Sequence, residues 1–117
     1  MTADPDCIFC KIVSKQIPAS MVYQDEQVTA FNDLNPQAPT HVLLVPNHHI
    51  ANTEALESEH DAAVGAVLRA ARSVARAAGV ADSGYRLVVN TGRDANNTVA
   101  HLHVHLLGGR GMAWPPG

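Results

Sequence analysis

Three histidines alternate with aliphatic residues near the end of the chain, in the segment His101-Leu102-His103-Val104-His105-Leu106. Alternate side chains of a β-strand point to opposite faces, so this spacing predicts three imidazoles on one face and three aliphatic side chains in the core. Neighbouring imidazoles resist simultaneous protonation, because each positive charge raises the cost of the next. The group suits metal ligation, acid–base chemistry or nucleophilic chemistry, and a solvent-exposed row of histidines is the alternative.

The only two cysteines, Cys7 and Cys10, form a C-x-x-C pair. By itself this pair fits a redox couple, half of a zinc site or coincidence. Two cysteines so close together are too few for the disulfide framework of a small secreted protein, so the sequence favours a reduced, intracellular chain.

Composition narrows the class of protein. The chain has 117 residues, of which 46% are hydrophobic and 4% aromatic, and this predicts a single domain over residues 1–117 with an aliphatic core. Its net charge is −3, and no basic run could follow a nucleic-acid backbone. No apolar run reaches the roughly 18 residues of a membrane span, and the start is acidic where a signal peptide would be basic. We therefore expect a cytoplasmic protein that binds neither nucleic acid nor membranes.

The histidine segment needs a sheet to position it, and five stretches have strand character. They are residues 22–24, 28–31, 41–45, 85–90 and 101–107. A short helix is expected over residues 8–13, and a long one begins after Ser58-Glu59-His60-Asp61, which resembles a capping box, and ends at Gly79. Its arginines share the outer face, and its predicted core face comprises Val64, Val67, Leu68, Ala71, Val74, Ala75 and Ala78.

The order of these elements predicts the fold class. Three strands, one long helix and two strands with short connections favour an α+β domain with a five-stranded antiparallel sheet, one long helix and a short N-terminal helix. Residues 108–117 are rich in glycine and proline and are expected to form an irregular tail.

Several motifs together resemble the histidine-triad (HIT) family of nucleotide hydrolases and transferases. Besides His101-Leu102-His103-Val104-His105-Leu106-Leu107, they include Cys7-Ile8-Phe9-Cys10-Lys11-Ile12, Ile17-Pro18-Ala19, Phe31-Asn32-Asp33-Leu34, Pro36-Gln37-Ala38-Pro39-Thr40-His41, Val88-Val89-Asn90, Gly108-Gly109-Arg110 and Trp114-Pro115-Pro116-Gly117. The resemblance covers nearly the whole chain and is to the Hint-like branch. His105 stands where the uridylyltransferase branch has Gln, and the closing Trp-Pro-Pro-Gly differs from the Fhit-like branch.

The resemblance implies a two-step reaction at the α-phosphorus of a nucleotide conjugate. His103 would attack phosphorus, and water would then cleave the nucleotidyl-histidine. A neutral imidazole, whose ordinary pKa is about 6.5, is both a good nucleophile and a good leaving group at pH 7. The family holds its other ring nitrogen on a backbone carbonyl of the motif strand. His105 would bond the phosphoryl oxygens or protonate the departing amine.

The resemblance also implies the nucleotide-binding residues. Asp33 would accept hydrogen bonds from the ribose hydroxyls, and Asn90, Thr98 and the main-chain amides near Val99 would surround the phosphate. The chain has Asn96-Asn97-Thr98 where relatives usually have Gly-Gln or Gly-Gly before Ser or Thr, and Asn tolerates the left-handed backbone such a loop needs. The base would lie against Ile8, Phe9, Ile12, Ile17 and Phe31, which without the resemblance are ordinary core residues.

For the cysteines, the resemblance implies a structural zinc ion. Its ligands would be Cys7, Cys10, His49 and His101, with His48 as the alternative to His49, because bacterial-type relatives pair the C-x-x-C with these histidines. Such a Cys₂His₂ set completes a tetrahedral site. His41 is interpreted as a hydrogen-bonded strand residue and His60 as an exposed one, and neither is given a catalytic role.

Hint-like proteins join two subunits through their sheets, and the tail carries a Trp into the neighbouring site. The resemblance therefore implies a homodimer that extends the sheet, with Trp114 reaching the partner's nucleotide. The leading hypothesis is a zinc-containing hydrolase of purine nucleoside phosphoramidates of the AMP or GMP type. The alternatives are a dinucleoside polyphosphate hydrolase and a non-catalytic zinc-containing nucleotide-binding or scaffold protein.

Overall fold

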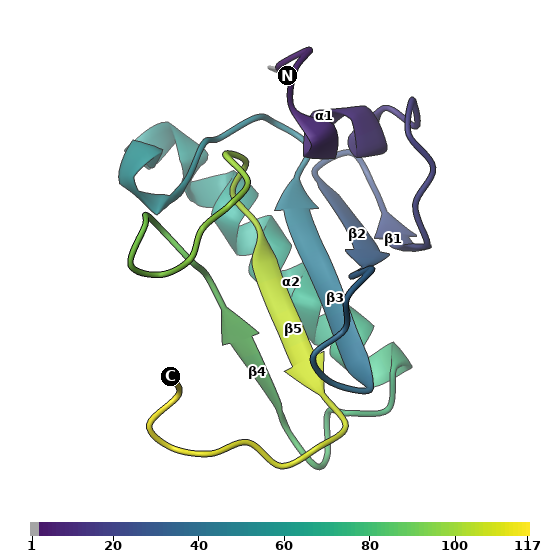
Figure 1. Cartoon of the computed structure of the whole chain (residues 1–117). Helices are drawn as coiled ribbons and strands as arrows, with labels where there is room; N and C mark the ends of the chain where they lie inside the picture. Colours follow the sequence, from purple (N-terminus) through teal and green to yellow (C-terminus); the bar gives the residue numbers. More distant parts are fainter. Residues whose placement is uncertain (1–2) are drawn as a thin grey trace.

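Five strands pair side by side in the order β1-β2-β3-β5-β4, and every pairing is antiparallel. This confirms the predicted α+β class. The computed structural model describes residues 3–117, and its elements are shown in Figure 1. Their bounds are α1 Ile8–Val13, β1 Met21–Gln24, β2 Val28–Asn32, β3 Thr40–Pro46, η1 Thr53–Ala55, η2 Ser58–His60, α2 Asp61–Ala77, β4 Tyr85–Val88 and β5 Val104–Gly108. Within the described residues, no helix is both long enough and apolar enough to cross a membrane.

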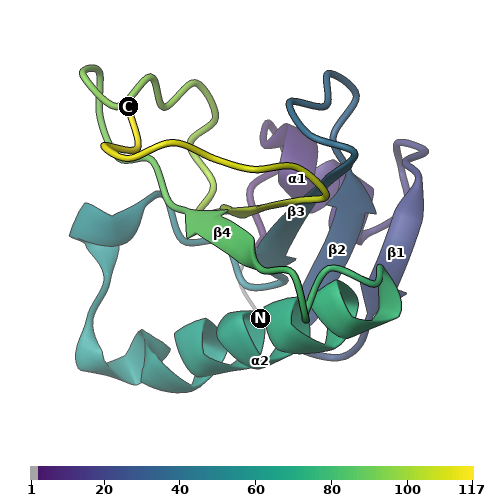
Figure 2. The same ribbon diagram turned by 90° about the horizontal axis from the view of Figure 1, so that it is seen from below.

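The sheet has two different faces. Helix α2 covers one of them, and α1 lies on the other side, as Figure 2 shows. Because strand side chains alternate, Val42 and Leu44 of β3 join the α2 core, whereas Leu43 and Val45 join a second cluster with α1. The α2 core consists of Val28, Ala30, Val42, Leu44, Ala66, Val67, Ala70, Ala71, Val74, Ala75, Val80, Val104 and Leu106. His41, two residues before Leu43, and His105, which pairs with Leu43, therefore belong to the face that α2 leaves open.

The last strand is shorter at its start than the sequence predicts. β5 begins at Val104, because its ladder with β3 ends at the Leu44–Val104 pair. Before that point the backbone turns aside, and Leu102 N donates to Ile50 O at 2.6 Å. Leu102, Val104 and Leu106 are nevertheless buried, as the sequence predicts. At the other end β5 includes Gly108, so the irregular tail starts at Gly109 rather than at residue 108.

Three details of the helix prediction are wrong. Leu68 is 47% exposed rather than buried, because the core face of α2 is centred on small residues such as Ala66 and Ala70. Ala78 is also exposed, because the helix ends at Ala77. The capping box uses Glu57 instead of Ser58: Glu57 N donates to His60 Nδ1 at 2.9 Å. His60 is therefore a structural residue, and it is half-buried rather than exposed as expected. The predicted stop is confirmed, because Gly79 adopts φ +77° directly after the helix.

Candidate active site and metal centre

His103 is a buried imidazole with a free ring nitrogen. Its Nδ1 lies 2.7 Å from His101 O, and a carbonyl only accepts hydrogen bonds, so Nδ1 carries the proton. The neutral ring then has its lone pair on Nε2. Phe9 meets the His103 ring edge-on, with 5.2 Å between the ring centroids, and this contact limits its rotation. The carbonyl is that of the motif segment itself, as the resemblance implies.

The protonation of His105 is set through His41. Gln37 N donates to His41 Nδ1 at 3.0 Å, so in the neutral ring His41 carries its proton on Nε2. That nitrogen lies 2.9 Å from His105 Nδ1 and 3.5 Å from Asp33 Oδ2. His105 Nδ1 therefore accepts, and its own proton resides on Nε2. His105 thus presents a hydrogen-bond donor at Nε2, whereas His103 presents a lone pair there.

Burial keeps the rings of His41 and His105 neutral near pH 7. It lowers the pKa of His105 to about 4, and the neighbouring His103 and His41 add to this shift. Burial also lowers the pKa of His41, although Asp33 opposes that change. A neutral His105 can still donate one hydrogen bond from Nε2, which is the form a phosphoryl oxygen requires.

Asp33, His41 and His105 bring three ligand-type atoms within 4.8 Å of one another. This grouping is a hydrogen-bond relay rather than a metal centre. A metal on His41 Nε2 would move the proton to Nδ1, where it would face the N–H of Gln37. Two donors would then oppose each other, so the relay is the arrangement that satisfies both groups.

The second cluster has the properties of a zinc site. It brings together Cys7, Cys10, His49 and His101, whose ligand atoms all lie within 4.8 Å of one another. His101 Nδ1 lies 3.2 Å from Cys7 Sγ, 3.5 Å from Cys10 Sγ and 3.2 Å from His49 Nδ1. Cys10 Sγ lies 3.3 Å from His49 Nδ1. Metal–ligand distances of about 2.3 Å to sulfur and 2.0 Å to nitrogen imply separations of roughly 3.3–3.8 Å between tetrahedral ligands, so these residues fit zinc.

The orientation of His101 agrees with a role as a ligand. Its Nε2 lies 2.9 Å from Pro46 O and so carries the proton, which leaves the Nδ1 lone pair directed at the cluster. Burial lowers the pKa of His101 to about 4. His48, the alternative ligand, lies instead beside His60, with 5.7 Å between the ring centroids. The structure therefore groups His49 rather than His48 with the cysteines.

Comparisons with known proteins agree with this geometry. The model of the HIT domain matches residues 14–112. The chain belongs to the HIT family. It is 47% identical over 105 residues to the purine nucleoside phosphoramidase of Escherichia coli strain K12, covering 90% of this chain and 88% of that protein. It is also 47% identical over 116 residues to the 14 kDa zinc-binding protein of Zea mays, covering 97% and 90%.

Solved HIT structures share the whole fold. The crystal structure of a HIT family hydrolase from Legionella pneumophila Philadelphia 1 superposes with a TM-score of 0.94 at 44% identity, and covers 96% of this chain and all of that one. A histidine triad protein from Clostridium difficile gives a TM-score of 0.93 at 38% identity, covering 96% and 97%.

In this HIT chain, the residues predicted to hold the base line one apolar cavity of about 220 Å³. Ile8, Phe9, Ile12, Ile17 and Phe31 are all part of its wall, and Asp33 stands at the same cavity. Phe9 and Phe31 pack edge-on with 5.5 Å between centroids. The structure thus brings the six predicted residues together, with an aromatic wall and one carboxylate.

The residues predicted to surround the phosphate line a neighbouring, more polar cavity of about 460 Å³. Asn90 and Thr98 meet His103 and His105 there. Asn96 belongs to the same wall and adopts φ +59°, the left-handed backbone that the Asn-Asn sequence was expected to tolerate. Asp33 lines both this cavity and the apolar one, so the two are adjacent.

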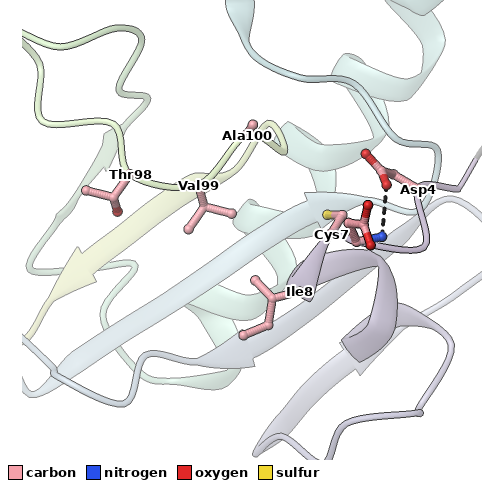
Figure 3. A pocket seen from close by; sticks show the side chains of 7 residues that line it. Asp4, Cys7, Ile8, Thr98, Val99 and Ala100 are labelled. Atoms are coloured by element: carbon pink, nitrogen blue, oxygen red, sulfur yellow. Dashed lines mark hydrogen bonds between the residues drawn. The ribbon is translucent and has the colours of Figure 1, made fainter.

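A third cavity, of about 270 Å³, adjoins both. Figure 3 shows Cys7 and Ile8 at the start of α1 on one side of it, and Thr98, Val99 and Ala100 on the other. Asp6 N donates to Asp4 Oδ1 at 2.9 Å beside it, which shapes the approach to α1. Ile8 is shared with the apolar cavity and Thr98 with the polar one. Val99, predicted beside the phosphate, lines this third cavity and not the polar one.

The prediction that Trp114 reaches a partner's nucleotide stays a prediction: within one chain Trp114 is 82% exposed and lines none of the three cavities. His41 is a hydrogen-bonded strand residue, as the sequence predicts. Its direct contact with His105 was not predicted. The available signal was register: His41 and His105 come from adjacent strands, with His41 paired to Leu107 and Leu43 to His105, and so share one face.

Proposed function

We propose that this protein hydrolyses purine nucleoside phosphoramidates, or related AMP and GMP conjugates, at the α-phosphorus through a nucleotidyl-histidine. One observation carries the proposal. His103 donates Nδ1–H to His101 O at 2.7 Å, which leaves Nε2 bare beside a polar cavity of about 460 Å³. The 47% identity to the Escherichia coli purine nucleoside phosphoramidase supports the substrate class.

In the first step, the Nε2 lone pair of His103 attacks the α-phosphorus, and the phosphorus–nitrogen bond to the leaving amine breaks. The bond electrons leave with the amine nitrogen, which takes up a proton. His105 donates a hydrogen bond from Nε2 to the phosphoryl oxygens, and because this ring is neutral, the proton that the amine takes up comes from solvent water. The backbone carbonyl of His101 stabilises the positive charge that forms on the His103 ring during the attack.

In the second step, water attacks the same phosphorus and the bond to His103 Nε2 breaks. The electron pair returns to the ring, and the nucleoside monophosphate leaves. The proton of the attacking water is released to solvent, which restores the proton consumed in the first step. Asp33 would hold the ribose hydroxyls, and the apolar cavity around Phe9 and Phe31 would take the base by its faces. Asn90, Thr98 and the amides near Val99 would donate to the phosphate.

We also infer that zinc binds Cys7, Cys10, His49 and His101. It would act structurally, because four protein ligands complete its tetrahedron. The name of the Zea mays relative, a zinc-binding protein, supports this inference. The ligands come from the start of α1, the segment after β3 and the segment before β5, so the metal would tie together three parts of the chain that contribute to the candidate active site.

Two copies of the chain would associate through β4, which is an edge of the sheet. Tyr85, Leu87 and Val89 alternate along this edge and are each at least 37% exposed. A free edge with an apolar face is normally covered. Sedimentation equilibrium is expected to give about twice the chain mass of 12.4 kDa. A Leu87→Glu variant is expected to sediment as a monomer, whereas a wild-type monomer at micromolar concentration would refute the association.

The reaction is tested by trapping its intermediate. Adenosine 5′-phosphoramidate is mixed with the protein, and the reaction is quenched within milliseconds at alkaline pH, where phosphohistidine-type bonds persist. Peptide mass spectrometry is expected to find one adenylyl group on His103. Turnover without any adduct, or an adduct on a different residue, would contradict the proposed nucleophile. Diadenosine polyphosphate, offered in parallel, separates the proposed substrate class from dinucleotide hydrolysis.

A further inference from the structure

Asp33 begins the segment between β2 and β3, His41 lies near the start of β3, and internal hydrogen bonds shape the segment. Asp33 N donates to His41 O at 3.0 Å, and Asn35 N donates to Asp33 Oδ1 at 2.8 Å. Gln37 Nε2 donates to Asn35 O at 3.0 Å. These bonds close the loop on itself, but its outer part, including Gln37, is exposed to solvent. The position of Gln37 therefore depends on what holds the loop from outside.

The residues that follow β5 hold this loop. Arg110 Nε donates to Gln37 O at 3.0 Å, and Arg110 Nη1 donates to Gly111 O at 3.0 Å. Gly109 lies against Pro39: it adopts φ +89°, and a Cβ at this position would lie 3.0 Å from Pro39 Cβ. The planar guanidinium thus connects the loop to the tail through two carbonyl groups, a geometry that a forked donor suits well.

Gln37 links this contact to the histidines. Its carbonyl receives Arg110, and its N–H, on the other side of the same α-carbon, donates to His41 Nδ1. That N–H determines which nitrogen of His41 is protonated. If the N–H moved away, His41 could carry its proton on Nδ1 and accept from His105 Nδ1. His105 would then have a bare Nε2, which repels a phosphoryl oxygen instead of binding it.

We propose that Arg110 is a positioning residue that acts through Gln37 and His41 to keep the proton of His105 on Nε2. Arg110 contacts the loop and does not touch the reacting atoms. Its effect on the reaction rate rests on the proposed function, whereas its effect on the histidine tautomers does not. Arg86 provides a matched comparison, because its Nη2 donates to the carbonyl of Ala113 at 3.0 Å and is likewise exposed, but Ala113 has no link to His41.

The tautomers are measured directly. Long-range ¹H–¹⁵N correlation spectra of the full-length protein, with ¹⁵N-labelled histidine, distinguish Nε2–H from Nδ1–H in each ring. In the wild type, His41 and His105 are expected to show Nε2–H. In Arg110→Met, part of both signals is expected to shift to Nδ1–H, whereas Arg86→Met keeps the wild-type pattern and Arg110→Lys restores it. Unchanged tautomers in Arg110→Met, or an equal change in Arg86→Met, would overturn the proposal.

Kinetics provide the second measurement. With adenosine 5′-phosphoramidate, Arg110→Met is expected to lower kcat about tenfold, the size of one lost hydrogen bond to a charged donor, and to change KM less than twofold. Arg110→Lys recovers most of the lost rate. An equal fall of kcat in Arg86→Met would mean that only the tail had loosened, and would overturn the role of Arg110. If the wild type turned over no phosphoramidate, the proposed function would fail and the spectra would still decide the role of Arg110.

Discussion

In the His103→Ala variant, kcat for adenosine 5′-phosphoramidate is expected to fall by at least about a thousandfold, because no other group supplies the attacking lone pair. Binding of AMP is expected to stay within about threefold of the wild type, since most of the nucleotide would contact the apolar cavity and Asp33. Steady-state kinetics and isothermal titration calorimetry measure the two quantities separately.

The His103→Ala variant needs two controls. Its zinc content should equal that of the wild type, because His103 is not in the metal cluster. A His60→Asn variant changes a histidine that lies at the start of α2, away from the three cavities, and should keep the wild-type kcat. Full activity in His103→Ala would refute the covalent mechanism, whereas inactivity together with lost AMP binding would point to a disrupted fold.

A Cys10→Ser variant is expected to purify without stoichiometric zinc. Its free energy of unfolding is expected to be lower than that of the wild type by at least about 3 kcal/mol. Cys10 is buried and lies within 3.5 Å of both histidines of the cluster, so its loss removes a ligand that the others cannot replace. Elemental analysis measures the metal content, and urea titration monitored by circular dichroism measures the free energy of unfolding.

Variants of the neighbouring residues His48 and His49 provide a matched comparison of zinc content. His49→Gln should lose zinc as Cys10→Ser does, because His49 Nδ1 faces Cys10 Sγ at 3.3 Å. His48→Gln should retain it, because His48 lies beside His60. The opposite result would transfer the ligand role to His48. Retention of one zinc per chain in Cys10→Ser would refute the Cys₂His₂ assignment.

Most of the fold could be predicted from local sequence patterns. Stretches of β-prone residues located all five strands to within a few residues, and helical spacing located α2, because burial of one helix face leaves a regular pattern in the sequence. The start of β5 was missed because the alternation of histidines and aliphatic residues begins at His101, before the first residue that pairs with β3. There the backbone is held by Ile50 O, a contact distant in sequence that no local pattern encodes.

The candidate site was predicted in part, from the family resemblance. The resemblance named residues that the structure gathers around three adjoining cavities, and a carbonyl partner for His103. It could not indicate that His41 sets the proton of His105, because that depends on one backbone N–H at Gln37 and on the pairing of β3 with β5. Hydrogen-bond direction is a property of three-dimensional placement, and one residue type is compatible with either tautomer.

Strand β3 is packed on both faces, and this limits which sequence changes the domain can tolerate. Val42 and Leu44 face α2, while His41 and Leu43 face the opposite side, so one inserted or deleted residue would exchange the two sets. Such a change would place an imidazole under α2 and an aliphatic residue beside His105. Length variation is thus forbidden within β3, whereas the exposed loop of residues 91–97 can gain or lose residues. Because Asn96 of that loop lines the polar cavity, we expect the shape of this cavity to vary through the loop, with the strand histidines unchanged.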